Sequence, residues 1–381
     1  MGSRLRRLVV LGALIAGSVA AWPAAEGAAA TVLPDVMVYV PRDGTMATVV
    51  VDEARYKITI PPTRYAFSGR FHGDDIGDVF LYSPPQQPGG PISGPDSILR
   101  IRLVSSKIVV SVSAVNVTGD YDPIVGDFDG NGLTDVLWYG FASHQSYLWY
   151  FHDDGSHTSR RVTLPTDVIP GHLVIDANGD GIDDILWKGD VDHIWIMHAD
   201  GSHSVRSGGS QPSEIGLLED IVGRFGTDVD GGPTDRRYLQ RDGRFTDELW
   251  IYDRHAGHTT HEVPDLGGAT GPGRPAIVGH FHAGRADSLL FYDGARPNRH
   301  EFAWDFDDDG AVHGRSIQQV AGAYATRVGD FDGNGYDDVV WYSRAGTSYL
   351  WSSDGTSFTS TTTTGVPHDA IAVAVLTAPK G

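Results

Sequence analysis

Three acidic loops in the chain carry oxygen side chains at the spacing of a cation site. In the first, from Asp127 to Asp135, side-chain oxygens recur at positions 1, 3, 5 and 9, and position 7 offers a main-chain carbonyl. Ca²⁺ takes about six to eight hard oxygen ligands, and alternate residues of a tight loop can point them inward. The loops therefore predict about three calcium sites. The predicted ligands are Asp127, Asp129, Asn131, Leu133 and Asp135 in the first loop, Asp176, Asn178, Asp180, Ile182 and Asp184 in the second, and Asp330, Asp332, Asn334, Tyr336 and Asp338 in the third, with Leu133, Ile182 and Tyr336 contributing carbonyl oxygens.

These loops are not EF-hands, because no helix is expected on either side and position 12 is not Glu. The alternative interpretation is a solvated acidic turn that caps a hairpin. Three copies of one unusual spacing favour calcium, bound with a dissociation constant of roughly 10⁻⁴ to 10⁻³ M, as in extracellular modules.

Each loop lies between two short apolar strands, and this unit recurs along the chain. Three further copies keep the strands but lose most of the acids. The six loops are separated by steps of 48 to 57 residues, a period that fits a four-stranded propeller blade. Position 1 of the loops falls at Arg70, Asp127, Asp176, Arg224, His280 and Asp330.

The rest of each unit is a second hairpin. An apolar strand at 147–151, for example, is followed by Asp154-Gly155 and a polar strand, and Asp-Gly between β-rich runs is typical of a hairpin turn. Each unit thus has four antiparallel strands, named A to D, with the acidic loop between A and B. Eight of the nine Trp fall at one position in strand B or one in strand C, which predicts packing between blades, with stacking on sugar as the alternative for some rings. They are Trp138, Trp187 and Trp341 in B, and Trp149, Trp195, Trp250, Trp304 and Trp351 in C.

The two ends of the chain predict a shared seventh blade. Residues 369–376 align with strand A, placing Ala374 at loop position 1, while 36–40 and 46–51 read as a C–D hairpin around Asp43-Gly44. We therefore expect an all-β, seven-bladed β-propeller of four-stranded antiparallel blades, closed by pairing of the N- and C-terminal strands. Six blades with frayed ends is the alternative. Closure removes exposed sheet edges and can substitute for disulfides, because the chain has no Cys.

The degenerate loops predict replacements for the cation. Arg70 and Arg224 stand at position 1, and we expect their guanidinium groups to pair with Asp78 and Asp235. Whether the loop at His280 binds anything is left open. The histidines at 255, 258 and 261 lack a recognised transition-metal spacing, and the acids at 305, 307 and 309 are interpreted as a C–D turn.

The first 30 residues read as a secretory signal peptide. Basic residues at 4, 6 and 7 precede an apolar stretch from Leu8 to Ala21, and Ala28-Ala29-Ala30 offers a cleavage site near Ala30. The apolar stretch is shorter than the roughly 20 residues of a spanning helix. We expect residues 31–381 to form a single secreted propeller domain, without a transmembrane segment and monomeric. The formal charge of -20 excludes nucleic acid as a partner and favours divalent cations.

The loops and their flanking strands resemble the FG-GAP or VCBS-type repeats of integrin α-subunit propellers and of many secreted bacterial proteins. The resemblance covers about residues 36–377 and is closest in the three acidic copies. It implies a β-propeller with calcium bound in the A–B loops. Because the family includes adhesion modules, lectins and propellers attached to enzymes, it leaves function open.

Topology and motifs favour a binding role. A–B loops and C–D turns should share one face, so the long segments 83–97, 140–146, 207–218 and 263–275 reach the other, where loops on a rigid scaffold commonly carry recognition. No nucleophile elbow, His-Glu-x-x-His, phosphate loop or Cys nucleophile is present. We expect a non-enzymatic binding or adhesion module for an extracellular glycan or protein. The alternative is a glycosidase or polysaccharide lyase whose acid and base come from different blades.

Overall fold

The computed structural model describes residues 35–41, 46–51, 54–61, 63, 65–74, 76–84, 95–104, 107–140, 145–165, 168–189, 191–210, 217–226, 236–241, 246–253, 255, 257–263, 276–292, 301–307 and 311–376. The predicted leader, the Asp43-Gly44 turn, Asp235 and most of the four long segments lie outside them. Among the residues described, no helix is long and apolar enough to cross a membrane.

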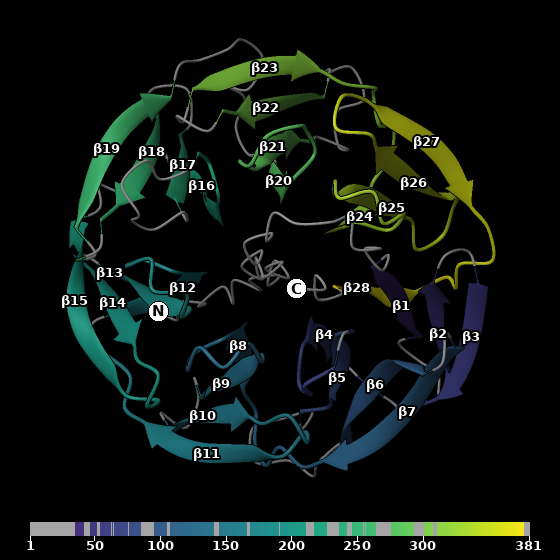
Figure 1. The fold of residues 1–381 in the computed structure, drawn as a ribbon, viewed down its shortest axis with the longest axis horizontal. Coiled ribbons are helices and arrows are strands. Elements are labelled where there is room, and N and C mark those ends of the chain that lie inside the picture. The colour runs from purple at the N-terminus through teal and green to yellow at the C-terminus, as the bar shows by residue number, and fades with distance from the viewer. Residues whose placement is uncertain are drawn as a thin grey trace, which may run out of the picture.

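Seven four-stranded antiparallel sheets form a ring around a central axis, which confirms the predicted fold class and blade count (Figure 1). Strand A of each blade lies nearest the axis and strand D forms the outer rim. Blades one to three are β4 (Tyr65–Gly69), β5 (Asp78–Tyr82), β6 (Asp96–Val104) and β7 (Lys107–Val115); β8 (Asp122–Gly126), β9 (Asp135–Tyr139), β10 (Ser146–Phe151) and β11 (His157–Val162); and β12 (Val168–Ile175), β13 (Asp184–Gly189), β14 (Val191–Met197) and β15 (His203–Ser210). Blades four to six are β16 (Leu217–Gly223), β17 (Arg236–Arg241), β18 (Asp247–Tyr252) and β19 (His258–Val263); β20 (Ala276–Gly279), β21 (Ser288–Phe291), β22 (Phe302–Phe306) and β23 (Val312–Ser316); and β24 (Ala325–Gly329), β25 (Asp338–Tyr342), β26 (Ser348–Ser353) and β27 (Phe358–Thr363).

The seventh blade closes the ring with strands from both ends of the chain. Its order is β28 (Ala370–Val375), β1 (Val36–Pro41), β2 (Met46–Val51) and β3 (Ala54–Thr59). The N-terminal hairpin therefore supplies strands B and C, and the expected C–D assignment is wrong. β1 is almost fully buried, as an inner strand must be, whereas the polar β3 forms the exposed rim. In the closing blade Val36 pairs with Val375, as Asp338 pairs with Gly329 in blade six. Loop position 1 of the closing blade therefore falls at Leu376, two residues after the predicted Ala374.

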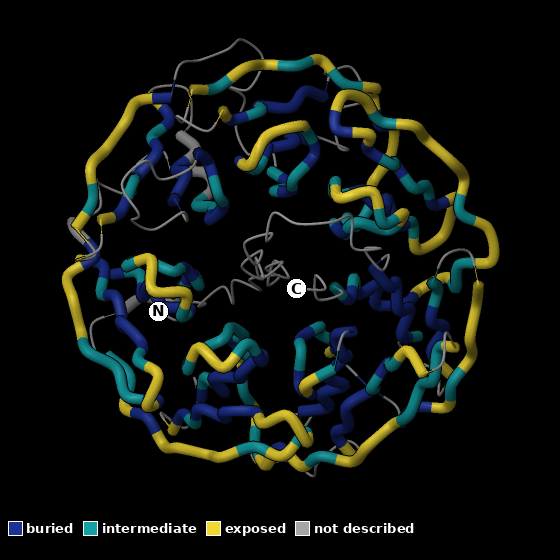
Figure 2. Tube along the Cα trace, viewed as in Figure 1, coloured by how far each residue is buried: buried dark blue, intermediate teal, exposed yellow. Residues whose placement is uncertain are grey.

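Large aromatic side chains fill the spaces between blades. All eight strand B and C tryptophans are at most 8% exposed, which confirms their packing role, and burial is concentrated in the inner three strands of each blade (Figure 2). Three of them also carry a stacked imidazole from strand D that sequence analysis missed: His157 on Trp149 at 3.8 Å, His203 on Trp195 at 4.0 Å and His258 on Trp250 at 3.9 Å between ring centroids. His258 thus has a packing partner apart from the other two histidines of its group.

A buried charge network joins blades three and four. Arg237 is fully buried, and its guanidinium donates to both carboxylate oxygens of Asp220 at 2.6 Å and to Asp192 at 2.7 Å. Lys188 contacts Asp220 at 2.7 Å. Two cations therefore balance two carboxylates, which is the condition for keeping charges in a protein interior.

Tyrosines at the end of strand B make a second kind of link between blades. The hydroxyl of Tyr342 donates to the carbonyl of Pro367 and accepts from the N–H of Ala370, at 2.9 and 2.8 Å. Tyr82 and Tyr292 make the same double contact with the D–A connection of the following blade. Each hydroxyl is thus satisfied in both directions and holds the chain as it enters the next strand A.

The A–B loops and the C–D turns share a face of the ring, as the topology predicts. The N–H of Gly73, in the loop of blade one, donates to Asp153 in the turn of blade two at 3.1 Å. Ala283 in blade five contacts Gly355 in blade six in the same way, at 2.9 Å. The loops of blades one and five are therefore supported by the turn of the following blade.

Candidate metal centre

The loop of blade two folds around the carboxylate of Asp127. Its two oxygens accept the backbone N–H groups of Asn131 and Gly132, at 3.1 and 2.8 Å. The loop of blade six repeats these bonds, with Asp330 accepting from Asn334 at 3.0 Å and Gly335 at 2.8 Å. Position 1 therefore closes the loop on itself and brings its ends together.

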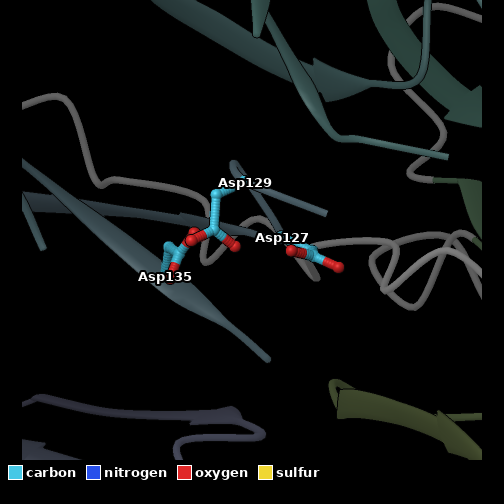
Figure 3. Close-up of side chains that lie close together, drawn as sticks. All are labelled: Asp127, Asp129 and Asp135. Carbon is cyan, nitrogen blue, oxygen red and sulfur yellow. The ribbon is translucent and has the colours of Figure 1, made fainter. Parts of the chain in front are cut away.

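The structure brings two sets of predicted carboxylates together. Asp127, Asp129 and Asp135 each place an oxygen within 4.8 Å of the others (Figure 3), and Asp330, Asp332 and Asp338 do the same. We call these the blade-two and blade-six triplets. Within the residues that the structure describes, they are the groups of three or more acidic or histidine side chains that meet this distance.

Position 9 anchors each triplet to the blade. Asp135 is fully buried and accepts the backbone N–H of Phe128 at 3.0 Å and of Phe151 at 2.9 Å. Asp338 is also fully buried and accepts from Phe331 and Ser353, at 2.9 and 2.8 Å. The carboxylate therefore ties the loop to the end of strand C and is held rigidly in place.

The asparagine at position 5 is oriented by a bond in each direction. Oδ1 of Asn131 accepts from Leu133 at 2.7 Å, and its Nδ2 donates to Phe151 O at 2.9 Å. Asn334 makes the matching bonds to Tyr336 and Ser353. The amide oxygen is thus on the loop side, where it can serve a cation.

The position-7 residues are held by their side chains. Leu133 is buried in the interior between blades one and two, Ile182 lies against Gly130, and the ring of Tyr336 stacks on His280 with centroids 5.6 Å apart. The role of their carbonyl oxygens as ligands stays a prediction.

The loop of blade three has the same backbone frame but no carboxylate triplet. Asp176 accepts from Gly179 at 2.7 Å and Gly181 at 3.0 Å, and Asp184 accepts from Ala177 and Met197 at 3.1 and 2.8 Å. Position 3 is Asn178 here, and its Nδ2 donates to Asp180 at 2.9 Å. The position-5 carboxylate is therefore engaged by an amide, and calcium at this third loop stays a prediction.

Burial makes the loops unfavourable for several ionised carboxylates in the absence of a cation. It raises the pKa of Asp135 to about 9, of Asp184 to about 8 and of Asp338 to about 7, and neighbouring carboxylates add to this effect. The pKa of Asp127 rises to about 6 for the same reason. A divalent cation would remove the penalty, and a donor set of hard oxygens without His or Cys fits Ca²⁺ better than a transition metal.

The loop of blade one places basic side chains beside the carboxylate, but not in the predicted pairing. Nδ1 of His72, at position 3, lies 2.8 Å from Asp78, and both are buried. Arg70 donates instead to the carbonyls of Asp74 and Gly132, at 3.0 and 3.3 Å. The expected Arg70–Asp78 pair is therefore wrong, because the shorter side chain two residues later already occupies the carboxylate.

Blades four and five replace the acids in other ways. Arg236 stands where the other loops have the buried Asp, and its Nη1 donates to Phe225 O at 2.7 Å. Arg224 lies 3.7 Å from Asp287, while its predicted partner Asp235 is outside the described residues. In blade five, Ser288 takes position 9 and contacts His282 at 2.9 Å.

Of the acids after Trp304, Asp305 and Asp307 make local pairings, while Asp309 and the turn itself lie outside the described residues. Asp305 pairs with Arg315 at 2.8 Å, and Asp307 contacts His313 at 2.7 Å. His280, whose role was left open, places Nδ1 3.3 Å from Ala286 O. These contacts are local pairings between strands and turns.

Comparison with known proteins agrees with this architecture. Residues 127–187 match the FG-GAP-like repeat family model, from the A–B loop of blade two to strand B of blade three. No curated protein matches the sequence.

Solved structures share the ring at low sequence identity. A protein from Lactobacillus plantarum is 12% identical with a TM-score of 0.52, covering 90% of this chain and 98% of its own. A candidate 6-phosphogluconolactonase from Bacteroides fragilis is 9% identical with a TM-score of 0.51, covering 90% and 97%. The periplasmic gluconolactonase of Pseudomonas aeruginosa is 13% identical with a TM-score of 0.49, covering 91% and 100%. For the first two structures, the likeness at these identities is one of fold alone. The chain is a seven-bladed β-propeller that carries an FG-GAP-like repeat across its second and third blades, as its acidic loops predict.

Proposed function

We propose that the chain is a secreted, calcium-binding propeller that acts as a binding module for an extracellular glycan or protein. The observation that carries the proposal is the pair of carboxylate triplets in blades two and six, each assembled on a rigid loop. Clustered hard oxygen ligands at hairpin loops are suited to Ca²⁺.

The three carboxylates of each loop have different structural roles in the proposed site. The position-1 carboxylate closes the loop, the buried position-9 carboxylate anchors it to strand C, and the position-3 carboxylate completes the triplet. Bound calcium would supply the positive charge that these carboxylates lack. The consequence is a stiffened face, which supports a structural role for the metal.

The hydrogen bonds of the triplets favour binding over catalysis. In both triplets, the two oxygens of the position-9 carboxylate accept hydrogen bonds from backbone N–H groups. A general acid or base must lie within reach of a substrate, and Asp135 and Asp338 are fully buried. These two carboxylates therefore support the loop structure, and we place recognition on other surfaces of the ring.

Titration calorimetry of the purified protein with CaCl₂, after removal of metal with EGTA, tests the calcium part. We expect saturable binding that is lost at one site in Asp129→Ala and at another in Asp332→Ala. Asp154→Ala is the matched control, because this exposed acid lies in a C–D turn on the same face. Binding that is equally strong in all variants would contradict the assignment.

A glycan and polysaccharide array, probed in calcium and again in EGTA, tests the binding part. We expect saturable binding of a glycan without turnover. Turnover of a polysaccharide would favour the enzyme. If folded protein binds nothing in either buffer, a protein partner is favoured over a glycan.

A further inference from the structure

A recurring pair of hydrogen bonds joins five of the A–B loops to the next blade within the residues that the structure describes. The residue at position 8 donates its backbone N–H to the carbonyl of position 1 in the preceding loop, and its side chain accepts the N–H of that same residue. We call this pair of bonds the clasp. Its members lie 2.7 to 2.9 Å apart and are Thr134 with Arg70, Asp183 with Asp127, Asp287 with Arg224, Asp337 with His280, and Asp35 with Asp330.

Two of these clasps involve residues of the blade-two and blade-six triplets. The main chain of Asp127 is held by Asp183, and that of Asp330 by Asp35, while the side chains of Asp127 and Asp330 belong to the triplets. The same residue therefore faces the metal loop with its carboxylate and the next blade with its peptide group. Anything that orders one side of this residue orders the other.

The clasp at Asp330 also crosses the closure of the ring. Asp35 directly precedes β1, the second strand of the shared blade, and is 7% exposed. On the other side of that blade, position 8 is Gly77, which has no side chain and makes only the backbone bond to Leu376 O, at 3.0 Å. The closing blade is thus held by a full clasp toward blade six and by half a clasp toward blade one.

We propose that Asp35 is a positioning residue for the blade-six calcium site, and that calcium bound there strengthens the docking of the N-terminal strands that close the ring. The inference rests on the calcium binding proposed above. Coupling between two sites is reciprocal, so whatever the clasp adds to calcium affinity, calcium adds to the clasp. Asp183 plays the same part between blades two and three and provides an internal comparison.

Hydrogen exchange measured by mass spectrometry, in calcium and in EGTA, reports the docking of each strand. In the wild-type protein, calcium should slow exchange in β1 and β28. Asp35→Ala should abolish most of this effect in β1 while leaving the calcium effect in β12 and β13. Asp183→Ala should abolish most of the calcium effect in β12 and β13 while leaving the effect in β1. Asp35→Asn keeps a carbonyl acceptor for the N–H of Asp330 and should behave like wild type.

Calcium titration of the same variants separates this inference from the proposed function. Asp35→Ala should weaken one site by roughly three- to tenfold, the net effect of one hydrogen bond. Asp332→Ala keeps the clasp but removes a ligand, so β1 should lose its calcium response without Asp35 being touched.

Absence of calcium binding in the wild-type protein would refute the proposed function and this inference together. Normal calcium binding, with β1 responding alike in Asp35→Ala and Asp183→Ala, would refute the inference alone. If Asp35→Ala does not fold, an unchanged calcium response of β1 in Asp332→Ala would overturn it.

Discussion

Calcium binding at neutral pH should release protons, because a buried carboxyl must ionise to become a ligand. Burial raises the pKa of Asp135 to about 9, so without a cation this group keeps its proton at pH 7. The pKa of Asp338 rises to about 7, so this group keeps about half of its proton. Calcium requires both in the ionised form. We therefore expect the release of between one and two protons when both triplets fill.

The same shift sets how stability depends on pH without metal. The folded-state pKa of Asp135 lies above its ordinary value of 3.8, so the folded state binds more protons than the unfolded state between these limits. The contribution of Asp135 to stability is then greatest below pH 3.8 and falls as pH rises toward 9. At pH 7 the shift destabilises the metal-free protein by about 4 kcal/mol. Calcium should cancel most of this loss.

Titration calorimetry at pH 7 in two buffers of different ionisation enthalpy measures the proton release directly. The apparent enthalpy of calcium binding should differ between PIPES and Tris by the number of protons released multiplied by the difference in ionisation enthalpy of the two buffers. Asp135→Asn should lower that number by about one, whereas Asp154→Asn, in an exposed turn, should leave it unchanged. Saturable calcium binding with equal enthalpies in both buffers would refute the reasoning.

Three further substitutions test contacts between blades, each by urea unfolding. Gly155→Ala should destabilise the protein more than Gly181→Ala. Both glycines have φ near +80°, which costs about 1–2 kcal/mol in each variant, but a Cβ at 155 would also lie 2.2 Å from Nε2 of His72 in blade one, whereas at 181 nothing lies within 4 Å. Equal losses in the two variants would contradict this. Arg237→Met should cost about 3–5 kcal/mol, because Asp192 loses the guanidinium and Asp220 is left with the contact to Lys188; an unchanged free energy of unfolding would contradict this. Tyr342→Phe should cost about 1–3 kcal/mol and speed exchange at the start of β28, because two backbone groups lose one hydroxyl; unchanged exchange would argue against the link.

Spacing predicts the parts of the fold that repeat. The acids of blades two and six come together because alternate positions of one loop must converge, and the strand B and C tryptophans are buried because every blade needs large side chains on its faces. The closing blade is predicted as a shared sheet but with the wrong strands, because the C–D assignment of 36–40 and 46–51 leaves out β3, whose alternating apolar and polar residues fit an outer strand.

Contacts between blades could not be read from a single repeat. The pairing of His72 with Asp78 depends on whether the side chain at loop position 1 or at position 3 reaches the buried carboxylate, and the sequence spacing does not show which one does. The clasp did leave a signal, since an acid directly precedes strand B in Asp183 and Asp337. Asp35 also directly precedes a strand B, but the strand A of its blade comes from the other end of the chain, so no strand A and loop precede Asp35 in the sequence to mark its position.

The shared blade also constrains the order in which the protein can mature. β1 is synthesised before β28, and Val36 can pair with Val375 only when nearly the whole chain has been synthesised. Until then an apolar inner strand presents an unpaired edge, which is the kind of surface that promotes aggregation of incomplete chains. Contacts this distant in sequence also slow folding. The final blade therefore forms late, and loss of β28 would expose the edge of β1 for the lifetime of the protein.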